Sequence, residues 1–486
     1  MARILPVLRA FSLILALFSV TMLAPLAVSW LIGDKAHGAY DDAFLVTAAT
    51  AGLLWLLSHR HTRELQIKDG FLLVVLTWTL LPAFACLPLL VFFWPNLSVT
   101  DAYFEAVSGV TTTGATVLSG LDTLPYSINL WRAELVWLGG MGLIVLAVAV
   151  LPLLGVGGRQ MFKAETPGPM KDSKLTPRIA HTAKGLWLIY GGITLACLIA
   201  MRWAGMSWGD ALIHTFTTMG LGGFSNHDAS FAYFGSVQIE LVTIFFMTMA
   251  GMNFATHFLV WRGRSLKPYR YDPEILGFLL VMYGSVLVIA WYLWHTDTYA
   301  DFPTALRYSA FNVVSIATTT GYANTDYNLW PHFAPLWMLF LCSFVTCSGS
   351  TGGGIKMIRA DILFKHVFRE ILRATHPSAV RPIKVGGAPM PSEIIFAVLA
   401  YGFMYMVIVA TLTLTLSFTG MQSDTAFSAV VACFNNTGPG LNEIGPAANY
   451  ACFNDFQTWV CTFAMLLGRL EIFTLLVVLT PAFWRR

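Results

Sequence analysis

Short segments rich in threonine, asparagine and glycine occur four times in this chain, each between two long apolar stretches. Two of them are nearly identical: Asp101-Ala-Tyr-Phe-Glu-Ala-Val-Ser-Gly-Val-Thr-Thr-Thr-Gly114 and Tyr308-Ser-Ala-Phe-Asn-Val-Val-Ser-Ile-Ala-Thr-Thr-Thr-Gly321. Residues 210–223 and 425–438 have the same length and also end in glycine. Backbone carbonyl groups arranged in a ring can replace the water around a cation. The four segments therefore predict a cation-selective filter built from four parts of one chain.

Glycine suits such a filter because carbonyl groups that converge on one axis need backbone angles that a side chain hinders. The common length of the segments aligns one glycine from each copy. A neighbouring glycine, Gly222 or Gly440, competes for this position in the second and fourth copies. The candidate ion-binding residues are Thr112, Thr113, Gly114, Gly222, Gly223, Thr319, Thr320, Gly321, Asn436, Thr437 and Gly438.

A second kind of break lies in the third copy, where residues 348–354 read Ser-Gly-Ser-Thr-Gly-Gly-Gly inside an apolar run. Each glycine costs a helix about 1 kcal/mol relative to alanine. Non-helical backbone at membrane depth is tolerated only where it lines a cavity or packs inside protein. We interpret the segment as a gate loop, with a fixed loop between two short helices as the alternative. Only this copy is expected to contain a broken helix.

Arg469 lies near the middle of the last apolar run. A central arginine costs about 2.5–3.5 kcal/mol on insertion, so it should face a cavity or a partner. The preferred hypothesis is an electrostatic brake below the filter, and the alternative is a structural contact with Glu471 or with carbonyl groups of the broken helix. Residues two apart on a helix do not face each other, which disfavours Glu471. The candidate gate residues are Gly349, Gly352, Gly353, Gly354, Lys356 and Arg469.

The composition shows which elements must position these residues. Hydrophobic residues make up 56% of the 486 residues and charged residues 11%, with a mean hydropathy of +0.66. These values exclude the soluble classes. About 20 apolar residues cross a hydrocarbon core of about 30 Å. Ten long helices are predicted, at residues 5–32, 43–58, 71–94, 131–155, 185–204, 237–261, 274–294, 334–373, 393–418 and 456–483.

The four glycine-ended segments begin with half-helices of about 10 to 12 residues, which are too short to cross a bilayer. Their carboxyl ends are expected to point inward, where each carries about half a negative charge and favours a cation. Side chains that can accept hydrogen bonds from free N–H groups precede each helix. The predicted caps are Ser98 or Thr100, Ser207, Thr304, and Ser423 with Asp424.

The expected fold is an all-α polytopic membrane protein. Four pseudo-repeated units of helix, pore half-helix and helix surround one pore, and two accessory helices precede them. The expected boundaries are 1–70 for the accessory domain, 71–155 for the first repeat, 156–272 for a cytoplasmic link and the second repeat, 273–390 for the third repeat with gate loop 348–354, and 391–486 for the fourth repeat.

Most lysine and arginine residues fall on one side of the membrane if the amino terminus is cytoplasmic. Cytoplasmic loops retain such residues, so both termini are predicted in the cytoplasm. The net charge of +3 follows from this topology and gives no reason to invoke nucleic acid. Most of the seven cysteines are expected to pack in the core, and Cys452, in an outer loop, is a candidate to pair with Cys433 or Cys461.

The motifs quoted above, together with Gly-Gly-Phe-Ser-Asn-His-Asp-Ala-Ser, Asn-Asn-Thr-Gly-Pro-Gly-Leu and Gly-Arg-Leu-Glu-Ile-Phe, closely resemble the TrkH family. Its members are the pore-forming subunits of bacterial Trk potassium uptake systems, in the Trk/Ktr/HKT superfamily. The resemblance implies an inner-membrane homodimer with one pore per protomer, potassium as the transported ion and no other cofactor. It also implies one key filter glycine per repeat, a gate loop at residues 348–354, and Arg469 as the pore arginine.

The family further implies a cytoplasmic ring of nucleotide-binding TrkA-type subunits that opens the pore. No Gly-x-Gly-x-x-Gly follows a strand pattern in this chain, so a nucleotide site would belong to that partner. Relatives with serine in place of the first filter glycine tend to admit sodium, and this chain has Gly114 there.

Two alternative functions and the role of one carboxylate complete the sequence analysis. A symporter that couples potassium to protons or sodium needs ionisable residues at a midplane site, and the chain has few membrane carboxylates. An intramembrane enzyme would use His214, Cys433 or Asp210, but a catalytic pair needs hydrogen-bond geometry that the sequence does not supply. Glu105, in the first half-helix, either attracts cations to the mouth or has a capping or packing role.

Overall fold

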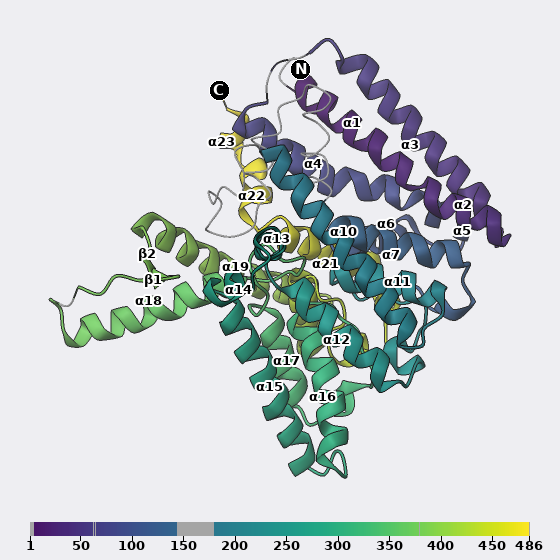
Figure 1. Ribbon diagram of the computed structural model, residues 1–486. Helices are drawn as coiled ribbons and strands as arrows, with labels where there is room; N and C mark the ends of the chain where they lie inside the picture. Colours follow the sequence, from purple (N-terminus) through teal and green to yellow (C-terminus); the bar gives the residue numbers. More distant parts are fainter. Residues whose placement is uncertain (1–3, 62, 64, 143–178, 379, 486) are drawn as a thin grey trace.

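Four half-helices recur along the chain, each preceded and followed by a further helix of its unit. Figure 1 shows the course of the chain. The structure is a computed structural model that describes residues 4–61, 63, 65–142, 179–378 and 380–485. The half-helices are α6 (Val99–Val110), α11 (Trp208–Gly220), α16 (Phe302–Ala317) and α20 (Ser423–Phe434). The helices that precede them are α4 (Ile67–Ala85), α10 (Ile179–Trp203), α15 (Ile275–His295) and α19 (Ser392–Phe418), and those that follow are α7 (Tyr126–Gly140), α12 (Val237–Gly251), α17 (Phe333–Cys342) and α21 (Asp455–Arg469).

The packing of these helices follows one rule around the molecule. Each half-helix contacts the helix before it and the second long helix of the preceding unit. Thus α11 lies against α10 and α7, α16 against α15 and α12, and α20 against α19 and α17. The first half-helix, α6, lies against α4 and against α21 of the fourth unit. The four units therefore close into a ring.

The predicted all-α fold is confirmed. Strands in the described residues are limited to a hairpin of two residues a side, β1 (Lys384–Val385) with β2 (Ala388–Pro389). Six helical segments in the described part are long and apolar enough to cross a membrane: 5–32, 37–58, 68–93, 183–203, 275–295 and 392–418. The end of the predicted run 131–155 and the boundary between the first two repeats lie outside the described residues.

The expectation that only the third repeat contains a broken helix is wrong. In the second repeat, α12 and α13 (Phe254–Gly263) meet at a bend of 95°, and in the fourth, α21 and α22 (Phe473–Leu479) meet at 112°. The Asn253 side chain accepts the Ala255 N–H at 2.9 Å and so starts the new helix α13. Neither break contains a run of glycines, which is why the composition does not reveal them.

The half-helix caps agree with the prediction in the first two units. The Ser98 and Ser207 hydroxyls accept the N–H groups of Asp101 and Asp210, each at 3.0 Å. In the third unit the cap is Asp301, which accepts the Thr304 N–H at 2.8 Å, so the choice of Thr304 was wrong by one turn. The fourth half-helix begins after Gln422 with no side-chain cap, which contradicts the choice of Ser423 and Asp424.

Accessory helices cover the first unit. The remaining helices are α1 (Leu5–Thr21), α2 (Leu23–Ile32), α3 (His37–Ser58), α5 (Leu87–Phe93), α14 (Lys267–Tyr271), α18 (Met357–Thr375) and α23 (Pro481–Trp484). Of these, α1 packs on α3 and α4, and α2 packs on α7.

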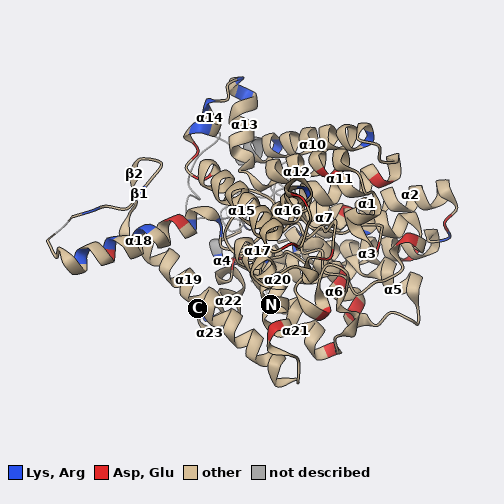
Figure 2. Ribbon diagram, turned by 90° about the horizontal axis from the view of Figure 1, so that it is seen from below, with Lys and Arg blue, Asp and Glu red and all other residues tan. Residues whose placement is uncertain are grey.

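The α18–α19 pair projects from the bundle and carries the β hairpin, and the two chain ends lie on one side (Figure 1). Lysine and arginine gather on α14 and α18, whereas acidic residues lie near α6 and α21 (Figure 2).

Candidate ion pathway

All four half-helices end in the same backbone turn, in which an N–H group just past the helix bonds to a carbonyl oxygen five residues earlier. Such a bond is typical of a helix that ends in a left-handed residue. The four bonds are Thr113 to Ser108 (2.8 Å), Gly222 to Thr217 (3.0 Å), Thr320 to Ser315 (2.8 Å) and Thr437 to Ala432 (2.8 Å). The chain therefore leaves each half-helix along the same path, although the four sequences differ.

Positive φ angles fix the register of the four segments. In each, one residue with φ between 54° and 59° is followed two positions later by a glycine with φ between 56° and 94°. The pairs are Thr112 with Gly114, Leu221 with Gly223, Thr319 with Gly321, and Asn436 with Gly438. Gly223 is thus the counterpart of Gly114, Gly222 takes the place of Thr113, and Gly440 lies outside the common pattern.

The four glycines lie in a closed ring of backbone contacts. A methyl group on Gly114 would come within 2.3 Å of the Gly222 carbonyl oxygen, and one on Gly223 within 2.3 Å of the Thr320 oxygen. The ring continues from Gly321 to the Thr437 oxygen at 2.1 Å, and from Gly438 back to the Thr113 oxygen at 2.6 Å. Each contacted carbonyl immediately precedes the next glycine in the ring. A side chain at any of the four glycines would therefore displace a carbonyl group of the neighbouring segment.

Hydrogen bonds between threonine hydroxyls fix the first and third segments. Thr111 and Thr113 share a hydrogen bond of 2.7 Å between their hydroxyls, and Thr318 and Thr320 share one of 2.8 Å. The fourth segment is joined to the first because the Asn436 amide donates to the Thr113 hydroxyl at 3.0 Å. These bonds hold the segments in place without a charged side chain in the ring.

The broken helix of the third unit lies directly below. Residues 343–356 separate α17 from α18, a wider gap than residues 348–354. The Gly353 N–H donates to the Thr319 hydroxyl at 2.9 Å, and the Thr351 hydroxyl donates to the Met219 carbonyl at 3.0 Å. A methyl group on Gly353 would lie 2.0 Å from the Asn435 carbonyl oxygen. The loop is therefore pressed against the ends of α11, α16 and α20.

Two basic side chains contact the loop. The buried Lys356 ammonium donates to the Gly352 carbonyl. Arg469, at the end of α21, donates to the Thr351 carbonyl at 3.1 Å and to the Thr112 hydroxyl at 3.3 Å. Its guanidinium also donates to the carbonyls of Gly139 and Gly140 and lies 5.3 Å from the centre of the Trp78 ring. The arginine thus contacts the filter segment and the loop at the same time.

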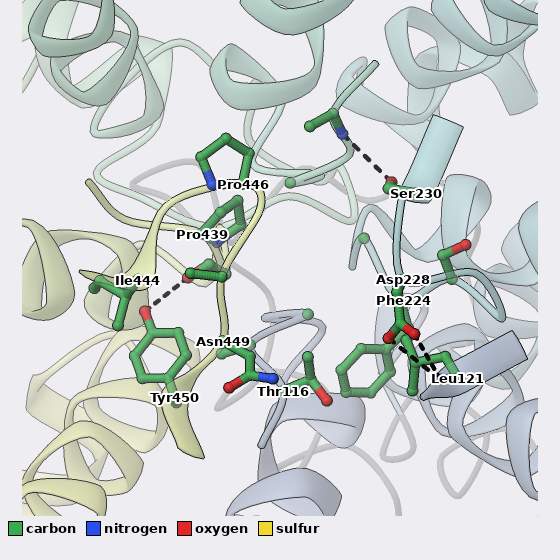
Figure 3. A pocket seen from close by; sticks show the side chains of 18 of the residues that line it. Thr116, Leu121, Phe224, Asp228, Ser230, Pro439, Ile444, Pro446, Asn449 and Tyr450 are labelled. Carbon is green, nitrogen blue, oxygen red and sulfur yellow. Dashed lines mark hydrogen bonds between the residues drawn. The ribbon is translucent and has the colours of Figure 1, made fainter. Parts of the chain in front are cut away.

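An outer pocket of about 80 Å³ opens above the ring and is lined by all four glycines (Figure 3). Asp228 lines it and accepts the Leu121 N–H at 3.1 Å. The neighbouring His227 bonds to Asp122 and, at 3.2 Å, to Asp210. Burial lowers the pKa of His227, but the hydrogen bonds with Asp210 and Asp122 outweigh it, so the pKa lies above its ordinary value. Burial raises the pKa of Asp122, but the hydrogen bonds from His227 and from the Asp228 N–H outweigh it, so the pKa lies below its ordinary value.

Comparison with known proteins agrees with this geometry. The sequence model of one family, TrkH, described as a cation transport protein, matches residues 38–485. The chain belongs to the TrkH family. It is 45% identical to the Trk system potassium uptake protein TrkH of Halomonas elongata and 46% identical to that of Vibrio parahaemolyticus, over 99% of each chain. The crystal structure of the potassium transporter TrkH from Vibrio parahaemolyticus is similar over 99% of both chains, with a TM-score of 0.89 and 44% identity.

Membership of the family confirms the resemblance that the motifs indicated. The groups considered for an enzyme are used in other ways: His214 bonds to the Asp210 carbonyl at 2.8 Å and to the Ser225 hydroxyl at 2.9 Å. The Cys433 thiol lies 3.7 Å from the Tyr450 hydroxyl. All seven cysteines are free, Cys452 included.

Sequence reasoning missed two residues that hold the pathway. Tyr450 donates to the Gly438 carbonyl at 2.7 Å, which orients one glycine of the ring (Figure 3). Glu274, just before α15, accepts the N–H groups of Ser348 and Ile358 on both sides of the loop. A carboxylate at the edge of an apolar run, two residues after Asp272, was the only sequence signal for Glu274, and no signal marked Tyr450.

Proposed function

We propose that this chain takes up potassium across the bacterial inner membrane through a gated, potassium-selective pore. The observation that carries the proposal is the closed ring in which Gly114, Gly223, Gly321 and Gly438 each lie against a carbonyl of the next segment. Rings of backbone carbonyls replace the hydration shell of a cation. The printed names of the relatives, which are potassium uptake proteins, support potassium as the ion.

The surroundings of the ring favour a cation over an anion. Four half-helices end just before it, and the carboxyl end of a helix carries about half a negative charge. The carbonyl groups of the ring are held by the repeated turn and, at Gly438, by Tyr450. We infer that Thr112, Thr113, Gly222, Thr319, Thr320, Asn436 and Thr437 complete the filter with the four glycines.

We infer further that the loop at Gly349, Gly352, Gly353 and Gly354 is the gate, with Lys356 and Arg469 as its charged partners. Its contacts with Thr319, Met219 and Arg469 support this, because they place backbone directly beneath the filter segments. A fixed loop with the same contacts would give a constant ion flux. A flux that changes with a regulator therefore distinguishes a gate from a fixed loop.

Partners and orientation belong to the same proposal. The chain acts as a homodimer in the lipid bilayer with both termini cytoplasmic, and a nucleotide-binding ring of TrkA type opens the gate from that side. The basic residues of α14 and α18 support a cytoplasmic docking surface, since cytoplasmic loops retain lysine and arginine. No catalytic role is proposed for any residue.

Ion flux into liposomes tests the filter. Purified wild-type protein should pass potassium and rubidium faster than sodium and lithium. Gly114→Ser should raise the relative flux of sodium, because its hydroxymethyl group meets the Gly222 carbonyl. Gly284→Ala, at a glycine with no atom near the added methyl group, serves as the control and should keep the wild-type order. An unchanged ion order in Gly114→Ser would remove Gly114 from the filter.

Flux measurements also separate a pore from the coupled symporter considered above. Potassium gradients of opposite direction, each with and without a proton or sodium gradient, separate the two mechanisms. A pore moves potassium only down its electrochemical gradient. Uphill uptake that requires a proton or sodium gradient would establish the symporter.

A further inference from the structure

One position recurs in the half-helices nine residues before each filter glycine. It is occupied by Glu105, His214, Asn312 and Ala429. The three polar side chains bond to the segment just beyond the filter: Glu105 to Thr116 at 2.9 Å, His214 to Ser225 at 2.9 Å, and Asn312 to Asn324 at 2.6 Å. A polar group thus joins the half-helix to the outer filter segment in three of the four units, and in the fourth Tyr450 holds Gly438 instead.

In the first unit this joint includes an ion pair. The Glu105 carboxylate accepts the Arg132 Nε–H at 2.8 Å, and the two side chains are 0% and 1% exposed. The same carboxylate accepts the Thr116 hydroxyl and the Val117 N–H at 3.0 Å. Because a buried charge without partners is costly, this set of donors offsets part of the cost of burying the Glu105–Arg132 ion pair beside the filter.

Arg132 extends the joint to the second unit. From α7 it donates to the Ser225 carbonyl at 3.1 Å and to the Thr116 hydroxyl at 3.2 Å. Its guanidinium also lies 4.3 Å from the centre of the Phe224 ring. Phe224 and Ser225 directly follow Gly223, so one side chain holds the outer ends of two neighbouring filter segments.

We propose that Glu105 and Arg132 are positioning residues for ion selection, which fix the outer ends of the first and second filter segments. The inference rests on the proposed potassium filter. Neither residue contributes a carbonyl to the ring. Loss of the pair would let two of the four segments move, and the discrimination between ions of different size depends on where their carbonyls lie. Arg132 also lines the outer pocket, where its charge without Glu105 would repel entering cations.

The ratio of potassium to sodium flux in liposomes tests the proposal, since a role in folding alone would not move it. Glu105→Gln and Arg132→Gln are each expected to lower this ratio by about tenfold, which corresponds to about 1.4 kcal/mol of lost discrimination between the two ions. In Glu105→Gln the total potassium flux should fall as well, because Arg132 is left unpaired. The double variant should restore part of the flux but not the ratio.

Glu240→Gln is the matched control. It breaks another Arg–Glu pair with two hydrogen bonds of 2.8 Å, to Arg307, and neither residue lines the pocket. This variant should lose stability but keep the wild-type ratio. Size-exclusion profiles and thermal unfolding establish that each variant is folded.

If neither ion-pair variant folds, Thr116→Val tests the positioning role of Glu105 and Arg132. It removes the hydroxyl that joins Glu105 and Arg132 while leaving both charges, and it should lower the ratio by a smaller factor. Wild-type ratios in folded Glu105→Gln and Arg132→Gln, or in Thr116→Val when those do not fold, would overturn the proposal. A wild-type protein that itself fails to prefer potassium would instead overturn the proposed function.

Discussion

The Glu274 carboxylate accepts the backbone N–H of Ser348 at 3.0 Å, across 74 residues of sequence. The same carboxylate accepts the Ile358 N–H at 2.9 Å. One buried side chain at the start of α15 therefore holds both ends of the proposed gate loop. Since only residues 272 and 273 separate α14 from Glu274, a movement of α14 has a direct route to the loop.

Glu274→Ala should loosen the loop and raise flux in the absence of a regulator. It leaves two buried N–H groups without an acceptor, at a cost of about 1–3 kcal/mol for each. Flux into liposomes and thermal unfolding measure the two effects. Glu393→Ala, at an exposed carboxylate, should change neither. Wild-type flux in folded Glu274→Ala would show that the carboxylate has no part in gating.

Arg469→Ala should raise potassium flux. The substitution removes a positive charge below the filter together with the hydrogen bonds to Thr112 and Thr351. Arg469→Lys keeps the charge but not the planar fork that reaches several carbonyls, so an intermediate flux is expected. Liposome flux with equal amounts of folded protein checks both. Unchanged or lower flux in Arg469→Ala would end the brake hypothesis.

Gly353→Ala should displace the loop from α20. Its methyl group would lie 2.0 Å from the Asn435 carbonyl, a backbone atom that cannot rotate away. Overpacking of this kind costs about 1–3 kcal/mol, so thermal stability should fall and the closed state should leak. In Gly284→Ala there is open space around the new methyl group. The free energy of unfolding should therefore be unchanged or higher by up to about 1 kcal/mol. Equal stability of the two variants would argue against tight packing of the loop.

The His227 cluster should make the outer mouth sensitive to pH. Because hydrogen bonds with Asp210 and Asp122 raise the pKa of His227 despite its burial, its stabilising effect is present below about pH 6.5 and is lost as pH rises through the folded-state pKa. The lowered pKa of Asp122 adds stability that is lost only as pH falls through its own folded-state value. His227→Gln should therefore lower the free energy of unfolding by up to about 1 kcal/mol at pH values between the folded-state pKa of Asp122 and that of His227. Thermal unfolding as a function of pH measures it, and identical curves for His227→Gln and wild type would refute the prediction.

The common backbone path of the four segments was predictable from sequence because its signal is repeated. A half-helix, a polar stretch and a glycine recur at one length, and even the drifted second and fourth copies keep it. The choice between Gly222 and Gly223 was not predictable. It depends on φ at Leu221, a residue type that gives no hint of a left-handed conformation.

The breaks in the second and fourth repeats were hidden for a related reason. Ile472 has φ of 57° and is fully buried, so tertiary packing overrides the preference of a β-branched residue. The Arg132–Glu105 pair was also out of reach, because its partners are 27 residues apart and belong to different helices. Periodicity and composition reveal elements, but they do not reveal which polar groups meet between elements.

The closed ring made by one polypeptide has a consequence for how such a pore varies. In a channel built from four identical subunits, each change in the gene appears in every wall at once. Here a single change alters one quadrant and leaves the other three intact, which is how Glu105, His214, Asn312 and Ala429 come to occupy equivalent places. Each quadrant is thus free to acquire its own chemistry in small steps, and the pore gains an orientation around its axis that a symmetric assembly lacks.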